Sequence, residues 1–324
     1  MTELGTDSGP IVTYNGPRRG RGRNAPKLFV PSMTHHEVLG ASRVSSAGLL
    51  IVGSWDMLPA VGGVGEQGPV ERCFGFSTKK TVGLYQYGQT GNPLEFSADW
   101  CYAGCLSEIR RLELGGSPSF EALLANPLTD TGSEPAAGWN FFRRAGFALK
   151  KYWAETPGFN PTEVGSAGGE ITASAWKSAA LGQASIVAPL GPELTQALLA
   201  ALSPFKDGKR GQSVQLSIAS STQAFDSSDG SRILLSSDFG GANYDHAVVL
   251  VGAAPTPVTY ECPVGVKFLL ANSWGITWGA RCEVPELAPT GNPTGNTILF
   301  PGCSWISERA AWAATDWSMV GEAA

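Results

Sequence analysis

Residues 271–279 read Ala-Asn-Ser-Trp-Gly-Ile-Thr-Trp-Gly, and they directly follow an apolar run at 267–270. A short continuous apolar run is typical of a buried strand, so Asn272 is expected close to the end of a strand. A side-chain amide in such a place can accept a hydrogen bond from an imidazole and fix the orientation of the ring. Asn272 is therefore a candidate to orient a histidine, although an asparagine beside Trp and Gly can also simply make a turn.

Histidines are scarce in this chain, and their positions single out one of them. Two of the three, His35 and His36, lie in the N-terminal region, and the third is His246, in the sequence Tyr-Asp-His-Ala-Val at 244–248. The apolar run at 247–251 predicts a second buried strand that begins beside this histidine. His246 is therefore the base that a catalytic site in the body of the chain would use.

A cysteine in a third segment is the candidate nucleophile. Residues 66–77 read Glu-Gln-Gly-Pro-Val-Glu-Arg-Cys-Phe-Gly-Phe-Ser, in which Cys73 follows a loop and precedes residues that could open a helix. A cysteine thiol has a reference pKa of about 8.5, so a nucleophilic cysteine needs a helix N-terminus or an imidazolium to stabilise its thiolate. The side-chain amide of Gln67 is a suitable donor to an oxyanion, together with the backbone N–H of Cys73.

The composition excludes several classes of protein. The chain has 324 residues, of which 43% are hydrophobic and only 16% charged, with 41 glycines, 22 prolines and a net charge of −5. This is enough apolar material for a large core, and the many glycines and prolines favour a loop-rich fold over a helical bundle. The net negative charge does not indicate a nucleic-acid-binding protein.

The ends and the hydropathy give an expectation for location. The N-terminus lacks a basic region followed by an apolar one, and no run of about 18 apolar residues occurs. We therefore expect no membrane span, and a cytoplasmic or virion-associated protein rather than a secreted one.

The chain divides into an expected N-terminal tail at 1–45, which carries several arginines, and a domain at 46–324. The hydrophobic spacing predicts early helices at 106–114 and 139–145 and a later one at 194–202, whereas the alternation at 214–218 predicts a half-buried strand. The Gly-, Ala- and Ser-rich stretch at 161–189 is expected to be a loop or insertion. Helices early and strands late indicate an α+β protein with two segregated subdomains.

The six cysteines do not form a recognisable metal or disulfide framework. Cys101 and Cys105 are not a Cys-x-x-Cys pair and no matching histidines follow, so no zinc site is expected. Most of the six are expected to be buried or free thiols, and the spacing leaves a Cys262–Cys282 bridge open.

Together the three segments resemble the papain-like (C1) cysteine peptidases. That family has a Gln-Gly pair six residues ahead of its cysteine, an Asp-His-Ala-Val strand entry and an Asn-Ser-Trp-Gly-x-x-Trp-Gly signature. The matching residues here are Gln67-Gly68, Cys73, 245–248 and 272–279. The likeness covers roughly residues 48–310, with insertions.

The resemblance implies a papain-like α+β fold, with a helical subdomain that carries Cys73, a β-rich, barrel-like subdomain that carries His246 and Asn272, and an active-site cleft between them. It also implies a thiol-dependent endopeptidase, or related amide hydrolase, that forms a thioester acyl-enzyme on Cys73. His246 would be the base, Asn272 would orient it, and Gln67 would donate to the oxyanion. The resemblance implies no cofactor and no metal ion.

Two further positions are candidate substrate-binding residues for a peptide or protein substrate. By the resemblance, Tyr244 would line the pocket for the residue next to the cleaved bond and would favour smaller side chains there. Trp274 would shield the contact between the asparagine and the histidine from water. The chain departs from the family pattern at Phe74, where the family has Trp, and at Glu71-Arg72, where the family has a small Gly-Ser pair.

Two other functions compete with the peptidase. One is a structural or assembly component, for example of a phage virion, that keeps the papain-like fold and binds protein partners through residues 1–45, with or without activity. The other is a different thiol hydrolase, such as a cell-wall amidase or a transglutaminase-like enzyme, against which the Asn-Ser-Trp-Gly segment argues.

Overall fold

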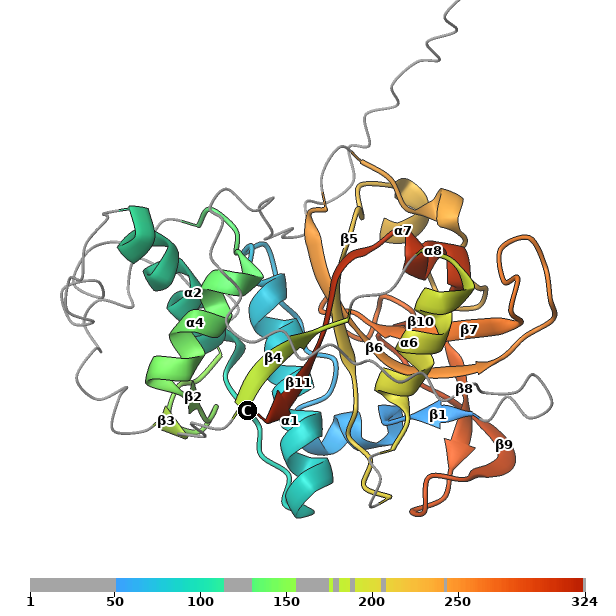
Figure 1. Cartoon of the computed structure of the whole chain (residues 1–324), viewed down its shortest axis with the longest axis horizontal. Coiled ribbons are helices and arrows are strands. Elements are labelled where there is room, and N and C mark those ends of the chain that lie inside the picture. The colour runs from blue at the N-terminus through green and yellow to red at the C-terminus, as the bar shows by residue number, and fades with distance from the viewer. Residues whose placement is uncertain are drawn as a thin grey trace, which may run out of the picture.

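The computed structural model describes residues 51–113, 130–155, 175–176, 181–186, 190–204, 208–241 and 244–322. These residues form a helical part and a part built on an antiparallel sheet, which lie side by side with helix α1 between them (Figure 1). The expected α+β class is therefore confirmed. The expected tail at 1–45 lies outside the described residues.

The helical part carries an aromatic core. Its α-helices are α1 (Cys73–Thr90), α2 (Ala98–Glu113) and α4 (Pro135–Ala145), and the 3-10 helix η1 (Trp55–Val61) packs against α1. The predicted helices at 106–114 and 139–145 correspond to parts of α2 and α4. Helix α2 begins at Ala98, as the sequence 96–100 predicts, because the Ser97 hydroxyl accepts a hydrogen bond from the Trp100 N–H at 3.1 Å and so acts as the N-cap.

Helix α1 begins at the candidate nucleophile. It ends at Gly91, which has a left-handed conformation (φ 67°) and donates its N–H to the Tyr87 carbonyl. Near its start, α1 comes very close to the start of α2: a Cβ added at Gly75 would lie 2.2 Å from the Ala98 carbonyl oxygen. The missing side chain at this position therefore sets the distance between the two helices.

The sheet part brings distant segments of the chain together. Within the described residues, its strand order is β10-β7-β6-β5-β11-β4, with β1 paired to β6, and all pairs are antiparallel. The strands are β1 (Val52–Gly53), β4 (Leu181–Ser185), β5 (Val214–Ile218), β6 (His246–Pro255), β7 (Val266–Ala271), β10 (Cys303–Ser307) and β11 (Thr315–Glu322). Because β6 and β7 are neighbours, the start of β6 lies beside the end of β7, where the two candidate motifs are.

Shorter elements complete the described fold. They are the pairs β2 (Phe147–Ala148) with β3 (Ala175–Trp176) and β8 (Glu283–Leu287) with β9 (Pro293–Leu299), the helices α6 (Pro192–Leu202), α7 (Gln223–Asp226) and α8 (Glu308–Trp312), and the 3-10 helix η3 (Ser236–Asp238). Helix α6 contains the helix predicted at 194–202. In the part of the chain that the structure describes, no helix combines the length and the apolar character needed to cross a bilayer.

Two expectations from the sequence are wrong. The stretch at 161–189 is not only loop, because it contains β3 and β4, and β4 pairs with β11 near the C-terminus. Strand β5 is buried on both faces rather than on one. Its polar face packs on α1, where the Gln215 side-chain N–H groups donate to the hydroxyl oxygens of Ser77 and Thr78 at 2.6 and 3.2 Å, so this amide nitrogen is hydrogen-bonded inside the protein.

Candidate active site

Cys73 lies at the point where the two parts of the fold meet. It is the first residue of α1, so its thiol is at the positive end of the helix dipole. Its Sγ accepts a hydrogen bond from the Ala247 N–H at 3.4 Å, and Ala247 directly follows His246 at the start of β6. The structure thus brings the candidate nucleophile against the strand that carries the candidate base.

His246 is held from two sides. Its Nε2 lies 2.7 Å from Oδ1 of Asn272, so the imidazole N–H donates to the amide oxygen. The Trp274 ring stacks on the imidazole, with ring centroids 4.7 Å apart. All three side chains are buried, so this hydrogen bond is shielded from water.

Asn272 is itself fixed by several hydrogen bonds. Its Oδ1 accepts a second hydrogen bond, from the Ser273 N–H at 2.7 Å, and its own N–H donates to the Gly302 carbonyl at 3.1 Å. Its carbonyl oxygen accepts a hydrogen bond from the Lys80 Nζ at 2.5 Å. Lys80 is buried on α1, and sequence reasoning did not identify it as part of this site.

Gln67 lies beside the same asparagine loop. Its Nε2 donates to the Val70 carbonyl at 3.1 Å, and its Oε1 accepts a hydrogen bond from the Ser273 hydroxyl. Its backbone N–H donates to the Ser273 carbonyl at 2.8 Å. The loop that leads to Cys73 is therefore joined through Gln67 to the loop that follows β7.

The two charged residues before the nucleophile have different surroundings. Arg72 is buried, where its Nη1 donates to the Asp99 carboxylate and its Nε to the Gln67 carbonyl at 3.0 Å. Glu71 is half-buried, and burial, together with the charge of Asp130, raises its pKa to about 7. Arg72, which stands where the family pattern has a small residue, is thus turned into the protein, since its side chain packs between the nucleophile loop and α2.

A small cavity lies next to the histidine. It has a volume of about 290 Å³, and its lining includes Ile218, Phe239, Tyr244 and Ala314. Ile218 is paired with His246 in the register of β5 and β6, so the cavity lies near the histidine, but none of the candidate catalytic residues lines it. Tyr244 lines this cavity, whereas Trp274 is buried against the imidazole and lines neither of the two cavities described here.

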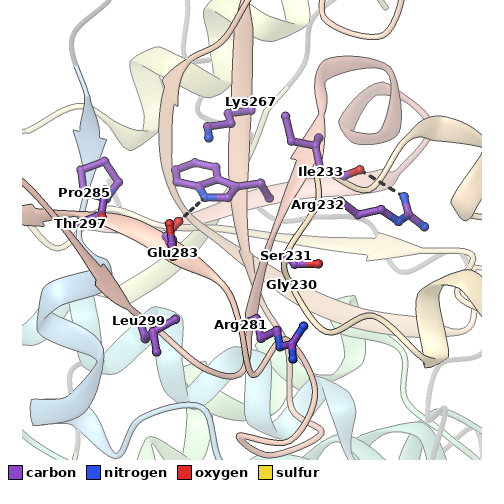
Figure 2. A pocket seen from close by; sticks show the side chains of 11 residues that line it. Gly230, Ser231, Arg232, Ile233, Lys267, Arg281, Glu283, Pro285, Thr297 and Leu299 are labelled. Atoms are coloured by element: carbon purple, nitrogen blue, oxygen red, sulfur yellow. Dashed lines mark hydrogen bonds between the residues drawn. The ribbon is translucent and has the colours of Figure 1, made fainter.

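A larger cavity, of about 520 Å³, lies elsewhere in the sheet part (Figure 2). It is bounded by the β8–β9 hairpin and residues 230–233, and its lining includes Lys267 and Arg281. Lys267 is near the opposite end of β7 from Asn272, and the candidate catalytic residues do not line this cavity. Although it is the larger of the two cavities described here, it is therefore not the site of the proposed thiol chemistry.

The cysteines form no disulfide, so the Cys262–Cys282 bridge that the spacing left open is absent. All six are buried. Burial raises the pKa of five thiols, which are Cys101, Cys105, Cys262, Cys282 and Cys303. Among the described residues, no group of three or more His, Cys, Asp and Glu side chains is arranged to hold a metal ion.

Comparisons with known proteins place this geometry in a known fold. No protein-family model and no curated protein sequence matches the chain. The structure is similar to xylellain, a cysteine protease from Xylella fastidiosa, at 16% identity and a TM-score of 0.57 over 95% of this chain and 99% of that one. It is also similar to procathepsin B S9 from Trypanosoma congolense, at 15% identity and a TM-score of 0.56 over 94% of this chain and 86% of that one.

A third similar structure is the bromelain protease from Ananas comosus, at 13% identity and a TM-score of 0.50 over 83% of this chain and 97% of that one. At these identities the likeness concerns the fold. The helical part that carries Cys73 and the sheet part that carries His246 and Asn272 have the arrangement expected from the sequence. This chain therefore has the fold of the papain-like cysteine proteases.

Proposed function

We propose that this chain is a thiol-dependent endopeptidase, or a related amide hydrolase, that acts through Cys73, His246 and Asn272. The observation that carries the proposal is the placement of the Cys73 thiol at a helix N-terminus, against the strand start where Asn272 orients His246 at 2.7 Å. A helix N-terminus stabilises a thiolate, and an amide partner selects the tautomer and orientation of the imidazole.

In the proposed reaction, His246 takes the proton of the Cys73 thiol, and the thiolate attacks the carbonyl carbon of the substrate amide. The negative charge moves to the carbonyl oxygen. The side-chain amide of Gln67 and the backbone N–H of Cys73 donate to this oxyanion. The hydrogen bonds of Gln67 to Val70 and Ser273 support this role, because they hold its amide beside the nucleophile loop.

Breakdown of the intermediate completes one half of the reaction. The imidazolium of His246 gives its proton to the leaving amine, the carbon–nitrogen bond breaks, and a thioester forms on Cys73. His246 then takes a proton from water as the water attacks the thioester. The acid product leaves and the thiol is regenerated, so the net reaction is the hydrolysis of one amide bond by one water molecule.

The cavity beside His246 supports a preference within this substrate class. Most of its lining residues are alanine, glycine or aromatic, its volume is about 290 Å³, and Tyr244 occupies part of its wall. We propose that it binds the substrate side chain next to the cleaved bond and accepts small apolar side chains better than large aromatic ones. A peptide library cleaved best at large aromatic residues in that position would contradict this preference.

The direct test is to treat the full chain with a peptidyl epoxide near neutral pH, locate the label by peptide mass spectrometry and assay cleavage of fluorogenic peptides. We expect the label on Cys73, its loss in His246→Ala, and no cleavage by Cys73→Ala. Cys105→Ala is the matched control, because it removes a buried thiol away from the site. We expect this variant to keep both the labelling of Cys73 and the cleavage of peptides. Equal, slow labelling of several cysteines would contradict the proposal.

The complete burial of Cys73 favours a second candidate function. A thiol without solvent exposure also suits an assembly component that keeps the fold and binds partners through residues 1–45. In that case, deletion of residues 1–45 impairs assembly, whereas Cys73→Ala does not. A chain that incorporates iodoacetamide at Cys73 but excludes the larger epoxide would favour this candidate over the peptidase.

A further inference from the structure

Lys80 is a buried lysine that has no part in the mechanism proposed above. It lies seven residues after Cys73 on α1, two helical turns away and on the same side of the helix. Only 1% of its surface is exposed, and burial lowers its pKa to about 7. Burying an ammonium group is costly unless it is well hydrogen-bonded, and its Nζ donates to the Asn272 carbonyl oxygen at 2.5 Å.

The neighbouring Lys79 shows how a buried lysine is ordinarily paired, with a carboxylate. Lys79 is equally buried, but its Nζ forms an ion pair with Glu155 at 2.6 Å. Among the described residues, no carboxylate lies within ion-pair distance of the Lys80 Nζ. Lys80 therefore directs its charge at the backbone of the candidate site rather than at a carboxylate.

The carbonyl that Lys80 holds belongs to the peptide unit between Asn272 and Ser273. A trans peptide is planar, and its C=O and N–H point in opposite directions. The N–H of this unit donates to Asn272 Oδ1 at 2.7 Å, and the same Oδ1 accepts from His246 at 2.7 Å. The orientation of this one peptide plane therefore sets the position of the oxygen that orients the imidazole.

The same segment also fixes the candidate oxyanion donor. The Ser273 hydroxyl donates to Gln67 Oε1, and the Ser273 carbonyl accepts the Gln67 N–H at 2.8 Å. A rotation of the peptide that Lys80 holds would disturb the contacts of His246 and of Gln67 together.

We propose that Lys80 is a positioning residue of the thiol site, whose ammonium holds the Asn272–Ser273 peptide in the orientation that presents Asn272 Oδ1 to His246. The catalytic meaning of this inference rests on the proposed function. The hydrogen bonds that lead from Lys80 through the Asn272–Ser273 peptide and Asn272 Oδ1 to His246 form a relay. This relay does not depend on turnover and is testable without a substrate.

The test compares Lys80→Met with Lys79→Met in the full chain. Methionine is about as long as lysine but cannot donate a hydrogen bond, and Lys79→Met is the matched control, since it removes an equally buried ammonium one residue away. The first readout is the proton NMR resonance of the His246 Nε2–H, assigned by its loss in Asn272→Ala. The second is the rate at which iodoacetamide alkylates Cys73.

We expect the His246 resonance to shift or broaden in Lys80→Met and to be unchanged in Lys79→Met. We expect alkylation of Cys73 to slow about ten-fold in Lys80→Met only, as the loss of one charge-assisted hydrogen bond implies. An unchanged resonance in folded Lys80→Met would overturn the inference, even if Cys73 is a nucleophile. If wild-type Cys73 is not selectively alkylated, the proposed function fails, and the resonance still decides the role of Lys80.

A second variant covers a failure of Lys80→Met to fold. Lys80→Gln keeps a polar side chain that is too short to reach the Asn272 carbonyl. Loss of the His246 resonance in folded Lys80→Gln supports the relay, and its retention contradicts it.

Discussion

Replacing Asp99 by Asn is expected to destabilise the fold by about 3–5 kcal/mol, because the Arg72 guanidinium then stays buried without that carboxylate. Arg72 is 1% exposed and Asp99 is fully buried, so water cannot replace the lost charge. A domain is commonly stable by only about 5–15 kcal/mol, so this single oxygen-to-nitrogen exchange removes a large part of the total.

Replacing Arg72 by Met is expected to lower the free energy of unfolding by a comparable amount. Arg72→Met leaves the Asp99 carboxylate buried without this arginine, and it also removes the hydrogen bond from Nε to the Gln67 carbonyl. In the double variant neither charge remains, so its loss should be smaller than the sum of the two single losses by at least about 2 kcal/mol.

The assay is urea unfolding at pH 7, followed by tryptophan fluorescence and circular dichroism, for the wild type, both single variants and the double variant. Asn is nearly the same size as Asp and Met fills most of the arginine volume, so the cycle isolates the charges. If the loss of stability in the double variant equals the sum of the two single losses to within about 0.5 kcal/mol, the two buried charges do not interact, and the expected coupling between Arg72 and Asp99 is contradicted.

Four further outcomes are expected. Gly75→Ala forces a Cβ to within 2.2 Å of the Ala98 carbonyl and should cost about 1–3 kcal/mol in urea unfolding; an unchanged midpoint would contradict the close approach of α1 and α2. Asn272→Ala should slow the alkylation of Cys73 by roughly ten- to a hundred-fold, and an unchanged rate would contradict its orienting role. Tyr244→Ala should shift a peptide library toward larger side chains next to the cleaved bond, and an unchanged preference would exclude Tyr244 from the pocket wall that contacts substrate. Burial lowers the pKa of Lys80 to about 7, so between pH 7 and about 10.4 the unfolded state binds one more proton than the folded state. The free energy of unfolding of the wild type relative to Lys80→Met should therefore rise by roughly 3 kcal/mol from pH 7 to pH 9.5. A difference in unfolding free energy that does not change with pH would contradict the lowered pKa.

The candidate site could be predicted because its residues lie in short local patterns. Cys73 at a helix start, His246 at a strand start and Asn272 after a strand are each visible in a few neighbouring residues. The fold then brings these three segments together, as the antiparallel pairing of β6 and β7 and the position of α1 require.

Lys80 could not be predicted, because its partner is 192 residues away and a lysine is normally taken as a surface residue. The strand β4 was missed for a similar reason. Its Gly-, Ala- and Ser-containing sequence has no periodicity, and it becomes a strand by pairing with β11. The burial of Gln215 depends on the hydroxyls of α1, which local alternation does not reveal.

Activation of the Cys73 thiol by His246 can be measured as the rate of alkylation by iodoacetamide between pH 5 and pH 9. The five other cysteines serve as internal references, since burial raises the pKa of each. We expect Cys73 to react selectively below pH 7 in the wild type, and His246→Ala to abolish this selective reaction. A Cys73 that reacts no faster than the other cysteines, or at the same rate in His246→Ala, would contradict this activation.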